Sequence, residues 1–399
     1  MSVAAIQLGQ VCRLDRRVTA ASEALSKGLE FVGMEHVDPE SGRIVLGQGS
    51  RTGEGKGQAF LFDDRHVLFG KLRPYLRKIA LPGQSGCAST ELVPLLPDAA
   101  RLDRGYLFHW VRRQHIIDVL MAKNTGARMP RADMSVLLDM AIPLPPLDEQ
   151  RRIVGLLDRA AEIRRRADAA RAKARAIIPA LFLDTFGDPA TNPKGWPVMT
   201  LGDTIISGPQ NGLYKPATDY GSGVRILRID SFDDGTIANQ GALKRLRLDQ
   251  ETTDKFELSE GDIVVNRVNS PPQLGKSVLI PRLEEPVVFE SNMMRMRVNS
   301  DLLLPPVLGV MLQLNSVRQA LIKNAKHAIN QSSINQGDVT GITVFAPPIP
   351  LQSVFAEHIQ RIDAVARHLD AAAAKAEAMA AGLSAEVFGQ SPSKGNGHG

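Results

Sequence analysis

The feature that most constrains this chain is an internal repeat, because the second half of the sequence matches the first at a constant offset of 202 residues. The matched residues include two adjacent prolines, a glutamine and a phenylalanine–glycine pair, namely Pro145-Pro146 with Pro347-Pro348, Gln150 with Gln352, and Phe186-Gly187 with Phe388-Gly389. A repeat of this length is a whole module used twice rather than one unit of a solenoid. The sequence therefore predicts approximate internal two-fold symmetry, which suits a near-symmetric partner such as duplex DNA.

The repeated stretch is predicted to be a long amphipathic helix. Apolar or small residues recur at steps of three or four, which places them on one helical face, and two such helices favour a coiled-coil pair. From Asp148 to Thr185 the first helix spans 38 residues, or roughly 57 Å. The larger residues expected to pack the helices together are Ile153, Leu157, Ile163, Ile177 and Leu181 in the first copy, and Phe355, Ile359, Ile362, Val365, Leu369, Met379 and Leu383 in the second. The alternative, two ordinary core helices of one large domain, fits poorly with helices of this length.

Proline and glycine mark the ends of both helices. Prolines precede each helix, where they fit best, and Gly187 and Gly389 follow as helix stops. A chain of 399 residues is also long enough for more than one core. We therefore predict, in chain order, a globular segment, a spacer helix, a second globular segment, a second spacer helix and a disordered tail, at residues 1–146, 147–187, 188–346, 347–390 and 391–399.

Both globular segments are predicted to be α/β or α+β domains with the same order of elements. The expected strands are Val67–Phe69, Ile79–Leu81 and Glu91–Leu96 in the first segment, and Val224–Ile229, Asp262–Val268, Lys276–Ile280 and Met293–Val298 in the second. The expected helices are Tyr106–Met121 and Val307–Lys323. Leu8-Gly9 matches Leu201-Gly202 at an offset of 193 instead of 202, so the segments have diverged by insertion and deletion. Divergence beside a constant spacer is expected if each segment recognises something different.

The composition fits a soluble protein with a polyanionic partner. The formal net charge is +5, the isoelectric point is about 9.2, and 43% of the residues are hydrophobic. The only cysteines, Cys12 and Cys87, form neither a metal-ligand spacing nor a disulfide framework, so the cytoplasm is the expected compartment. No run of residues is long enough to span a membrane. The first spacer helix is predominantly basic and the second predominantly acidic, which favours their association.

Basic and amide side chains cluster in both globular segments, where they suit DNA recognition. Arginine pairs with guanine, asparagine and glutamine pair with adenine, and lysine mostly contacts phosphate. Among them, Arg73 and Arg267 are expected in matching strand–loop regions of the two copies. The alternative for each residue is a solvated surface side chain. The candidate DNA-binding residues are Arg51, Lys71, Arg73, Arg77, Lys78 and Arg128 in the first segment, and Arg225, Arg267, Asn269, Lys276, Asn292, Arg295, Asn330 and Gln331 in the second.

No motif of the sequence carries a convincing catalytic set. A phosphate-binding loop, a Gly-rich dinucleotide fingerprint, a His-Glu-x-x-His segment and a Cys-x-x-Cys segment are all missing. The sequence therefore predicts no catalytic residue, no bound metal and no cofactor for this chain.

Several segments resemble the specificity subunit of type I restriction–modification systems. Residues 142–154, Ile-Pro-Leu-Pro-Pro-Leu-Asp-Glu-Gln-Arg-Arg-Ile-Val, are similar to the segment that opens that family's spacer helix, and Pro347-Pro-Ile-Pro-Leu-Gln352 is similar to its second copy. Gly195-Trp196-Pro197 with Leu201-Gly202 resembles the start of a target recognition domain. The resemblance covers essentially the whole chain. One departure is that no Gly-Trp-Pro lead-in precedes the first globular segment.

The resemblance implies a fold and a role. Two target recognition domains, held apart by an antiparallel coiled-coil helix pair, would each bind one half of a bipartite, asymmetric DNA site in a phage-defence system. The subunit itself would be no enzyme. It would recruit two methyltransferase subunits, which use S-adenosylmethionine, and restriction–translocase subunits, which use ATP and magnesium.

Two other interpretations remain open. A self-contained DNA methyltransferase or nuclease with paired recognition domains would require a catalytic set, which the motifs do not supply. A coiled-coil scaffold without a DNA role would leave the duplicated and diverged globular segments unexplained.

Overall fold

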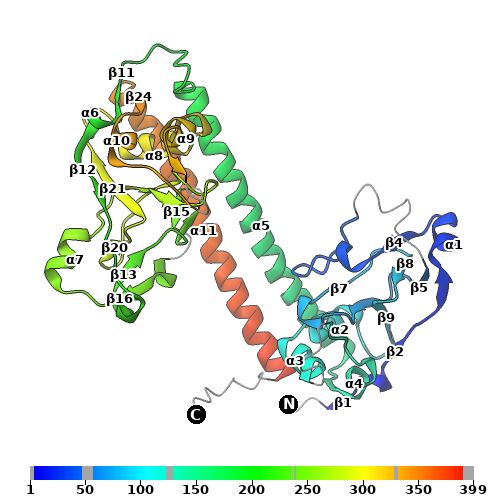
Figure 1. The fold of residues 1–399 in the computed structure, drawn as a ribbon. Coiled ribbons are helices and arrows are strands. Elements are labelled where there is room, and N and C mark those ends of the chain that lie inside the picture. Colours follow the sequence, from blue (N-terminus) through cyan, green and yellow to red (C-terminus); the bar gives the residue numbers. More distant parts are fainter. Residues whose placement is uncertain are drawn as a thin grey trace. The chain divides into compact units, whose positions relative to one another are not determined.

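The computed structural model describes residues 4–46, 57–122, 129–233, 235–237, 240–327 and 331–389, so the predicted tail lies outside the described residues. The chain forms two compact units. The first unit runs to Ala167 and resumes at Asp370, and the second is Asp168–Leu369. Helices α5 (Leu147–Phe186) and α11 (Ile349–Phe388), of 40 residues each, contribute one half to each unit (Figure 1). Both helices begin and end at the predicted offset of 202 residues.

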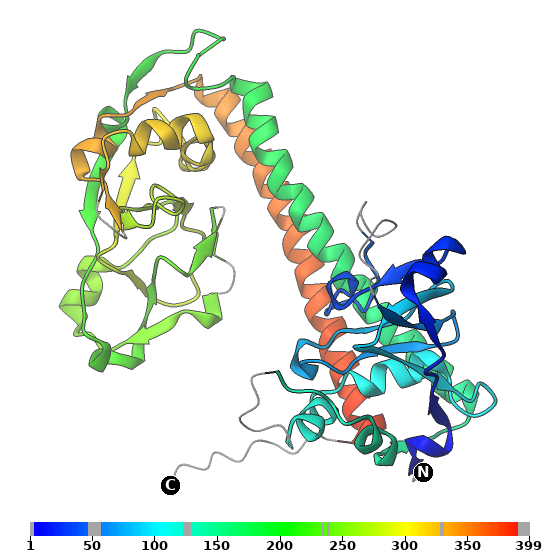
Figure 2. The same ribbon diagram turned by 45° about the vertical axis from the view of Figure 1, so that its right-hand side comes forward.

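The two long helices run antiparallel, because each unit pairs the beginning of one with the end of the other (Figures 1 and 2). In the first unit, Ile153 and Leu157 of α5 share a core with Phe388 of α11. In the second unit, Phe182 and Phe186 of α5 share a core with Phe355. The expected attraction between the helices is seen at Arg164, which pairs with Glu377. The fold class of two mixed α/β domains and a helical spacer is confirmed.

Left-handed glycines and side-chain caps end both helices. Gly187 has φ +86° and Gly389 has φ +81°, which a residue without a side chain adopts most easily. In the second unit Lys194 Nζ donates to the carbonyls of Asp184 (2.7 Å) and Thr185 (2.8 Å). In the first unit the Arg113 guanidinium donates to the Phe388 carbonyl at 2.6 Å. Cations are favourable at helix C-termini because the last carbonyls have no partner within the helix.

The described residues of the first unit form two four-stranded sheets and four short α-helices. One sheet is antiparallel, in the order β2 (Cys12–Leu14), β9 (Leu92–Pro97), β6 (Val67–Gly70), β7 (Ile79–Ala80). The other has the order β3 (Val18–Ala20), β5 (Gln58–Phe62), β8 (Gly86–Ser89), β4 (Glu30–Val32), with β4 parallel to β8. The short helices are α1 (Ala21–Ser26), α2 (Arg104–Val111), α3 (Gln114–Ala122) and α4 (Met134–Asp139). Strands β1 (Ala5–Gln7) and β10 (Ala141–Pro143) pair beside the start of α5.

The second unit repeats this plan. Its antiparallel sheet has the order β12 (Ile205–Asn211), β21 (Met293–Val298), β17 (Ile263–Asn266), β19 (Ser277–Leu279). A second sheet has the order β16 (Lys244–Leu246), β13 (Tyr220–Leu227), β20 (Val287–Phe289), with β13 parallel to β20. Smaller sheets pair β11 (Val198–Thr200) with β24 (Thr343–Phe345), β14 (Phe232–Asp233) with β15 (Thr236–Ile237), and β18 (Val268–Asn269) and β22 (Lys326–His327) with β23 (Ser332–Ser333). The helices are α6 (Leu201–Thr204), α7 (Gln250–Phe256), α8 (Pro305–Gln313), α9 (Asn315–Ile322) and α10 (Gln336–Thr340).

The repeated glutamines attach each long helix to its unit. Gln150 is fully buried, accepts from the Asp103 N–H at 2.8 Å, and donates to the carbonyls of Arg101 and Pro145, both at 2.8 Å. Gln352 makes the same three bonds in the second unit, with Leu304 N–H (2.8 Å) and the carbonyls of Leu302 (3.0 Å) and Pro347 (2.7 Å). A buried amide that satisfies three backbone groups explains why this residue is the same in both copies.

Replacing Gln150 with alanine is expected to destabilise the first unit, and replacing Gln352 the second. Each substitution leaves buried backbone groups unpaired. The free energy of unfolding falls by about 1–3 kcal/mol for each group that finds no new partner. Hydrogen exchange, measured in each unit at increasing urea concentration, gives the loss of stability. Gln10→Ala, at an exposed site of the first unit, is the control. Equal stability of the Gln10 and Gln150 variants would contradict this role.

Two predicted helices are each divided in the structure. The predicted helix Tyr106–Met121 is α2 followed by α3, with Arg112 and Arg113 between them, and Val307–Lys323 is α8 followed by α9. Leu314 has an extended backbone with ψ 137°, which ends α8. The apolar residues continue across both breaks, because the helices on each side bury one face in the same core. The sequence pattern therefore does not show the change of direction.

The residues predicted to pack the long helices together are buried or half-buried at nine positions and exposed at three. Ile153, Leu157, Phe355 and Ile359 are buried, and Ile163, Leu181, Ile362, Leu369 and Leu383 are half-buried. Ile177, Val365 and Met379 are instead 51%, 60% and 67% exposed. A repeat averaging 3.5 residues drifts around a helix of 3.6 residues per turn. The next residue, Ile178 in one copy and Ala380 in the other, packs on the core instead.

Candidate nucleic-acid interface

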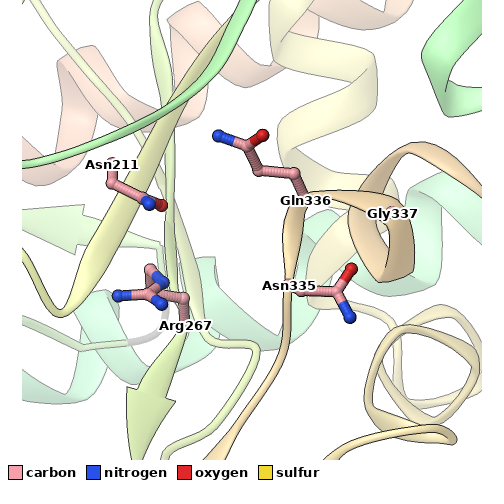
Figure 3. A pocket seen from close by; sticks show the side chains of 5 residues that line it. All are labelled: Asn211, Arg267, Asn335, Gln336 and Gly337. Atoms are coloured by element: carbon pink, nitrogen blue, oxygen red, sulfur yellow. The ribbon is translucent and has the colours of Figure 1, made fainter.

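A polar hollow of about 420 Å³ lies in the second unit (Figure 3). We call it the Arg267 hollow. Its lining comes from the end of β12, the link between β17 and β18, and the start of α10, and consists of Asn211, Arg267, Asn335, Gln336 and Gly337. The hollow thus brings together residues that lie up to 126 positions apart in the sequence.

Arg267 interrupts the predicted strand Asp262–Val268 and is fixed on three sides. Its N–H donates to the Asn292 carbonyl (2.9 Å), and its carbonyl accepts from the Ile334 N–H (2.9 Å). Its guanidinium Nη1 donates to the Ser291 carbonyl at 3.0 Å. Among the described residues, its buried Nε has no hydrogen-bond partner. The guanidinium is therefore positioned by the backbone at the edge of the hollow.

Amide side chains supply the rest of the hollow. Gln336 Nε2 donates to the Pro209 carbonyl at 2.6 Å, so its side chain reaches across to β12, where Asn211 is exposed (Figure 3). Asn335 caps α10, since its side chain accepts from the Asp338 N–H at 3.0 Å. The donors of an arginine and the donors and acceptors of neighbouring amides are complementary to the groups that base edges present in the major groove.

A second hollow of about 380 Å³ adjoins the first. Ser291 and Asn292, which hold Arg267, belong to its lining, and Tyr214 beside them is 80% exposed. Burial raises the pKa of Glu290, whose carboxylate accepts from the Ile229 N–H at 2.7 Å. The remaining lining residues are Leu213, Lys215, Ala217, Tyr220, Arg228 and Lys244. An exposed aromatic side chain with lysines nearby extends the polar surface around Arg267.

The structure places the other predicted residues of the second unit in different surroundings. Asn292 lines the second hollow. Asn269 and Lys276 are half-buried and Gln331 is exposed, while Asn330 lies outside the described residues. Their contact with DNA stays a prediction.

Arg225 and Arg295 are engaged within the unit. Arg225 forms an ion pair of 2.5 Å with Glu285, which also pairs with Arg245 at 2.8 Å. Arg295 Nη1 donates to the Glu257 carbonyl at 2.6 Å, and its guanidinium lies 5.6 Å from the ring centre of Phe289. Burial lowers the pKa of Arg295. Both arginines thus have partners within the unit, and their contact with DNA stays a prediction.

In the first unit, Lys78 and Arg77 also have partners of their own. Lys78 Nζ donates to the Val37 carbonyl at 2.6 Å, and the Arg77 guanidinium donates to Gln114. Lys71 is half-buried and Arg73 is exposed. The predicted residues Arg51 and Arg128 lie outside the described residues.

The backbone hydrogen bonds show that Lys71, and not Arg73, corresponds to Arg267. The Lys71 N–H donates to the Glu91 carbonyl at 2.9 Å, as Arg267 does to Asn292. The Lys71 carbonyl accepts from the Ala132 N–H at 2.7 Å, as Arg267 does from Ile334. Arg73 therefore lies in the matching strand–loop region, as predicted, but two residues beyond the equivalent position, because sequence similarity alone did not fix the register of these short strands.

Sequence reasoning missed Asn211, Tyr214, Asn335 and Gln336. One signal was present, because Asn335 and Asp338 have the spacing of a capping box and so mark a helix start. No local pattern placed that helix start beside β12, since only the folded unit brings the two together.

Comparisons with known proteins agree with this architecture. Residues 3–165 match the family model described as type I restriction modification DNA specificity domain. Over this part, the chain is similar to the DNA specificity domains of type I restriction–modification systems. Among its relatives, the StySPI specificity subunit of Salmonella potsdam is 22% identical over 89% of this chain and 75% of its own. The EcoKI specificity subunit of Escherichia coli K12 is 22% identical over 71% of this chain and 64% of its own. A putative specificity subunit of Methanocaldococcus jannaschii is 28% identical over 43% of this chain and 40% of its own.

Solved structures share the fold of this chain. The S subunit of a type I restriction–modification system from M. genitalium covers 98% of this chain and 97% of its own, with a TM-score of 0.61 and 11% identity. A chain from a study of complex assembly and conformational transition of the type I R-M system has a TM-score of 0.54 and 21% identity, and the match covers 96% of this chain and 97% of its own. Within the described residues, no group of three or more metal-ligand side chains is found. No helix in that part of the chain is long and apolar enough to cross a membrane.

Proposed function

We propose that this chain is a specificity subunit that binds double-stranded DNA through its two compact units, each of which contacts one half of a bipartite, asymmetric site. The observation that carries the proposal is the duplicated fold, in which equivalent backbone positions hold different side chains. Arg267 in the second unit corresponds to Lys71 in the first. Two units with the same backbone fold but different side chains at equivalent positions suit a DNA site whose two halves carry different bases.

The Arg267 hollow is the part of the second unit that contacts base edges. Its guanidinium suits the O6 and N7 acceptors of guanine, and the amides of Asn211 and Gln336 suit the N6 and N7 atoms of adenine. Lys215 and Lys244, which line the adjoining hollow, suit phosphate oxygens. The basic composition, with a net charge of +5, favours association with DNA and makes it salt-dependent.

The chemistry belongs to partner subunits that this chain brings to the site. These are two methyltransferase subunits, which use S-adenosylmethionine, and restriction–translocase subunits, which use ATP and magnesium. The long helices act as the spacer between the recognition domains at residues 1–146 and 188–346. The complex would work on DNA in the cytoplasm.

Replacing Arg267 with alanine is expected to weaken binding of the specific site by about 1–3 kcal/mol and to relax the base preference at one position of one half-site. A phosphate contact would instead weaken all sequences alike and reduce the salt dependence. Selection of bound duplexes from a randomised pool, followed by sequencing, distinguishes the two results.

Two further variants sharpen this test. Arg267→Lys keeps the charge but loses the planar pair of donors, so it should retain affinity better than base preference. Arg282→Ala removes an exposed arginine of the same unit and serves as the control. If the Arg267 and Arg282 variants behave alike in affinity, salt dependence and sequence preference, Arg267 is not part of the interface.

A further inference from the structure

Two segments of the first unit are joined into one small surface. The Arg73 N–H donates to the Pro130 carbonyl and the Ala132 N–H to the Lys71 carbonyl, both at 2.7 Å. Between these bonds, Leu72 and Arg131 form an antiparallel bridge. Residues 71–77 and 129–133 are therefore held side by side, and we call them the Arg131 surface.

An ion pair fixes the guanidinium at the centre of this surface. Arg131 Nη2 lies 3.4 Å from Glu91 Oε1, and its Nε lies 3.5 Å from Oε2, so the two side chains face each other in parallel. The Arg131 side chain is 52% exposed, while that of Glu91 is 24% exposed. The Glu91 carbonyl also accepts from the Lys71 N–H, so the carboxylate, Arg131 and Lys71 belong to one backbone cluster. Such a pair holds an arginine in place while leaving part of it accessible to solvent.

The second unit has the same backbone arrangement with different side chains. Its Val268–Ser333 bridge corresponds to the Leu72–Arg131 bridge, and Ser333 lies at the offset of 202 residues from Arg131. Asn292 takes the place of Glu91, since its carbonyl holds Arg267 as that of Glu91 holds Lys71. The first unit thus presents an arginine and a lysine where the second unit presents an arginine and a serine.

The surroundings of Arg131 are those of a contact surface. Tyr75, Leu76 and Met129 are 51%, 41% and 49% exposed, although large apolar side chains are mostly buried. Arg73 and Arg77, on either side of Tyr75 and Leu76, have φ values of +49° and +50°. Left-handed backbone is costly for residues other than glycine and persists mainly where the surrounding structure enforces it, often at functional sites.

We infer that Arg131, positioned by Glu91, contacts a guanine in the half-site bound by the first unit, and that the Arg131 surface is the interface of this unit with DNA. The inference rests on the proposed function and adds a specificity-determining residue to it. Glu91 acts as a positioning residue, because its carboxylate would hold the guanidinium in the plane of the base edge. Lys71, on the neighbouring segment, would contact the backbone phosphate or the same guanine.

The test uses the full-length chain, with and without the proposed methyltransferase subunit, and selection from a randomised duplex pool. Arg131→Ala should reduce the preference for guanine at one position of the first half-site by about 5- to 150-fold, which corresponds to about 1–3 kcal/mol. The preferences in the second half-site should stay as in the unmodified chain. Glu91→Gln should give a smaller loss at the same position, because the arginine remains but is less well held.

Arg267→Ala serves as the internal reference, because it should change only the second half-site. Arg131→Lys keeps the positive charge, so a loss of guanine preference without a general loss of affinity supports the bidentate contact. If Arg131→Ala and Arg131→Lys leave the first half-site unchanged while Arg267→Ala still relaxes the second, the inference is overturned and the proposed function stands. If the unmodified chain selects no bipartite sequence, the proposed function itself fails. If Arg131→Ala weakens binding of all sequences alike and also lowers the thermal stability of the chain, Arg131 has a purely structural role and the inference is overturned.

Discussion

Replacing Phe186 with alanine is expected to lower the free energy of unfolding of the second unit by about 3–5 kcal/mol. Phe186 is fully buried at the end of α5, and its ring centre lies 5.0 Å from that of Phe182 and 5.1 Å from that of Phe355. The substitution therefore removes three-way aromatic packing and leaves a cavity that neighbouring side chains fill only in part. Hydrogen exchange in β17 and β21 of the second unit measures the effect.

The repeat supplies a matched variant. Phe388 occupies the same position at the end of α11. Its ring centre lies 5.0 Å from that of Tyr106 in the core of the first unit. Phe388→Ala should therefore accelerate exchange in β6 and β9 of the first unit. Leu183→Ala, at a residue of α5 that is 43% exposed, should cost far less and is the control. Exchange that increases in the same unit for both phenylalanine variants would show that the helix ends are not anchored as described.

Four residues inserted into each long helix are expected to lengthen the gap between the two half-sites by one or two base pairs. The insertions are placed after Arg171 in α5 and near Asp370 in α11, because the contacts of Arg164 with Glu377 and of Phe186 with Phe355 bracket these positions. Four residues add roughly 6 Å at 1.5 Å per residue, and a base pair occupies about 3.4 Å along DNA. The insertion is slightly more than one turn, so the apolar face keeps its direction.

Sequencing the sites methylated by the variant together with the proposed methyltransferase subunit measures the gap. The bases of each half-site should stay unchanged, because the recognition residues are not altered. Two-residue insertions at the same positions are the control, since they rotate the apolar face by about half a turn and should abolish activity. An active four-residue variant with the original gap would contradict the role of the helices as a spacer. Altered half-site bases would show that the helices also take part in recognition.

The sequence by itself determined the two-fold repeat, the two long helices and the mixed α/β character of the segments before them. Helical periodicity, the proline-rich starts and the Phe-Gly ends are local properties, so α5 and α11 begin and end within about two residues of the expected positions. The repeated glutamine was also visible in the sequence, although its three backbone partners were not.

Only the tertiary structure decided which residues form the candidate interface. The Arg267 hollow joins β12, the β17–β18 link and the start of α10, and the Arg131–Glu91 pair joins segments 40 residues apart. It also decided that Lys71 corresponds to Arg267, and that Ile177 faces solvent. These outcomes depend on strand register and on the direction in which each element packs. Both are set by contacts between residues distant in the sequence, which local periodicity does not encode.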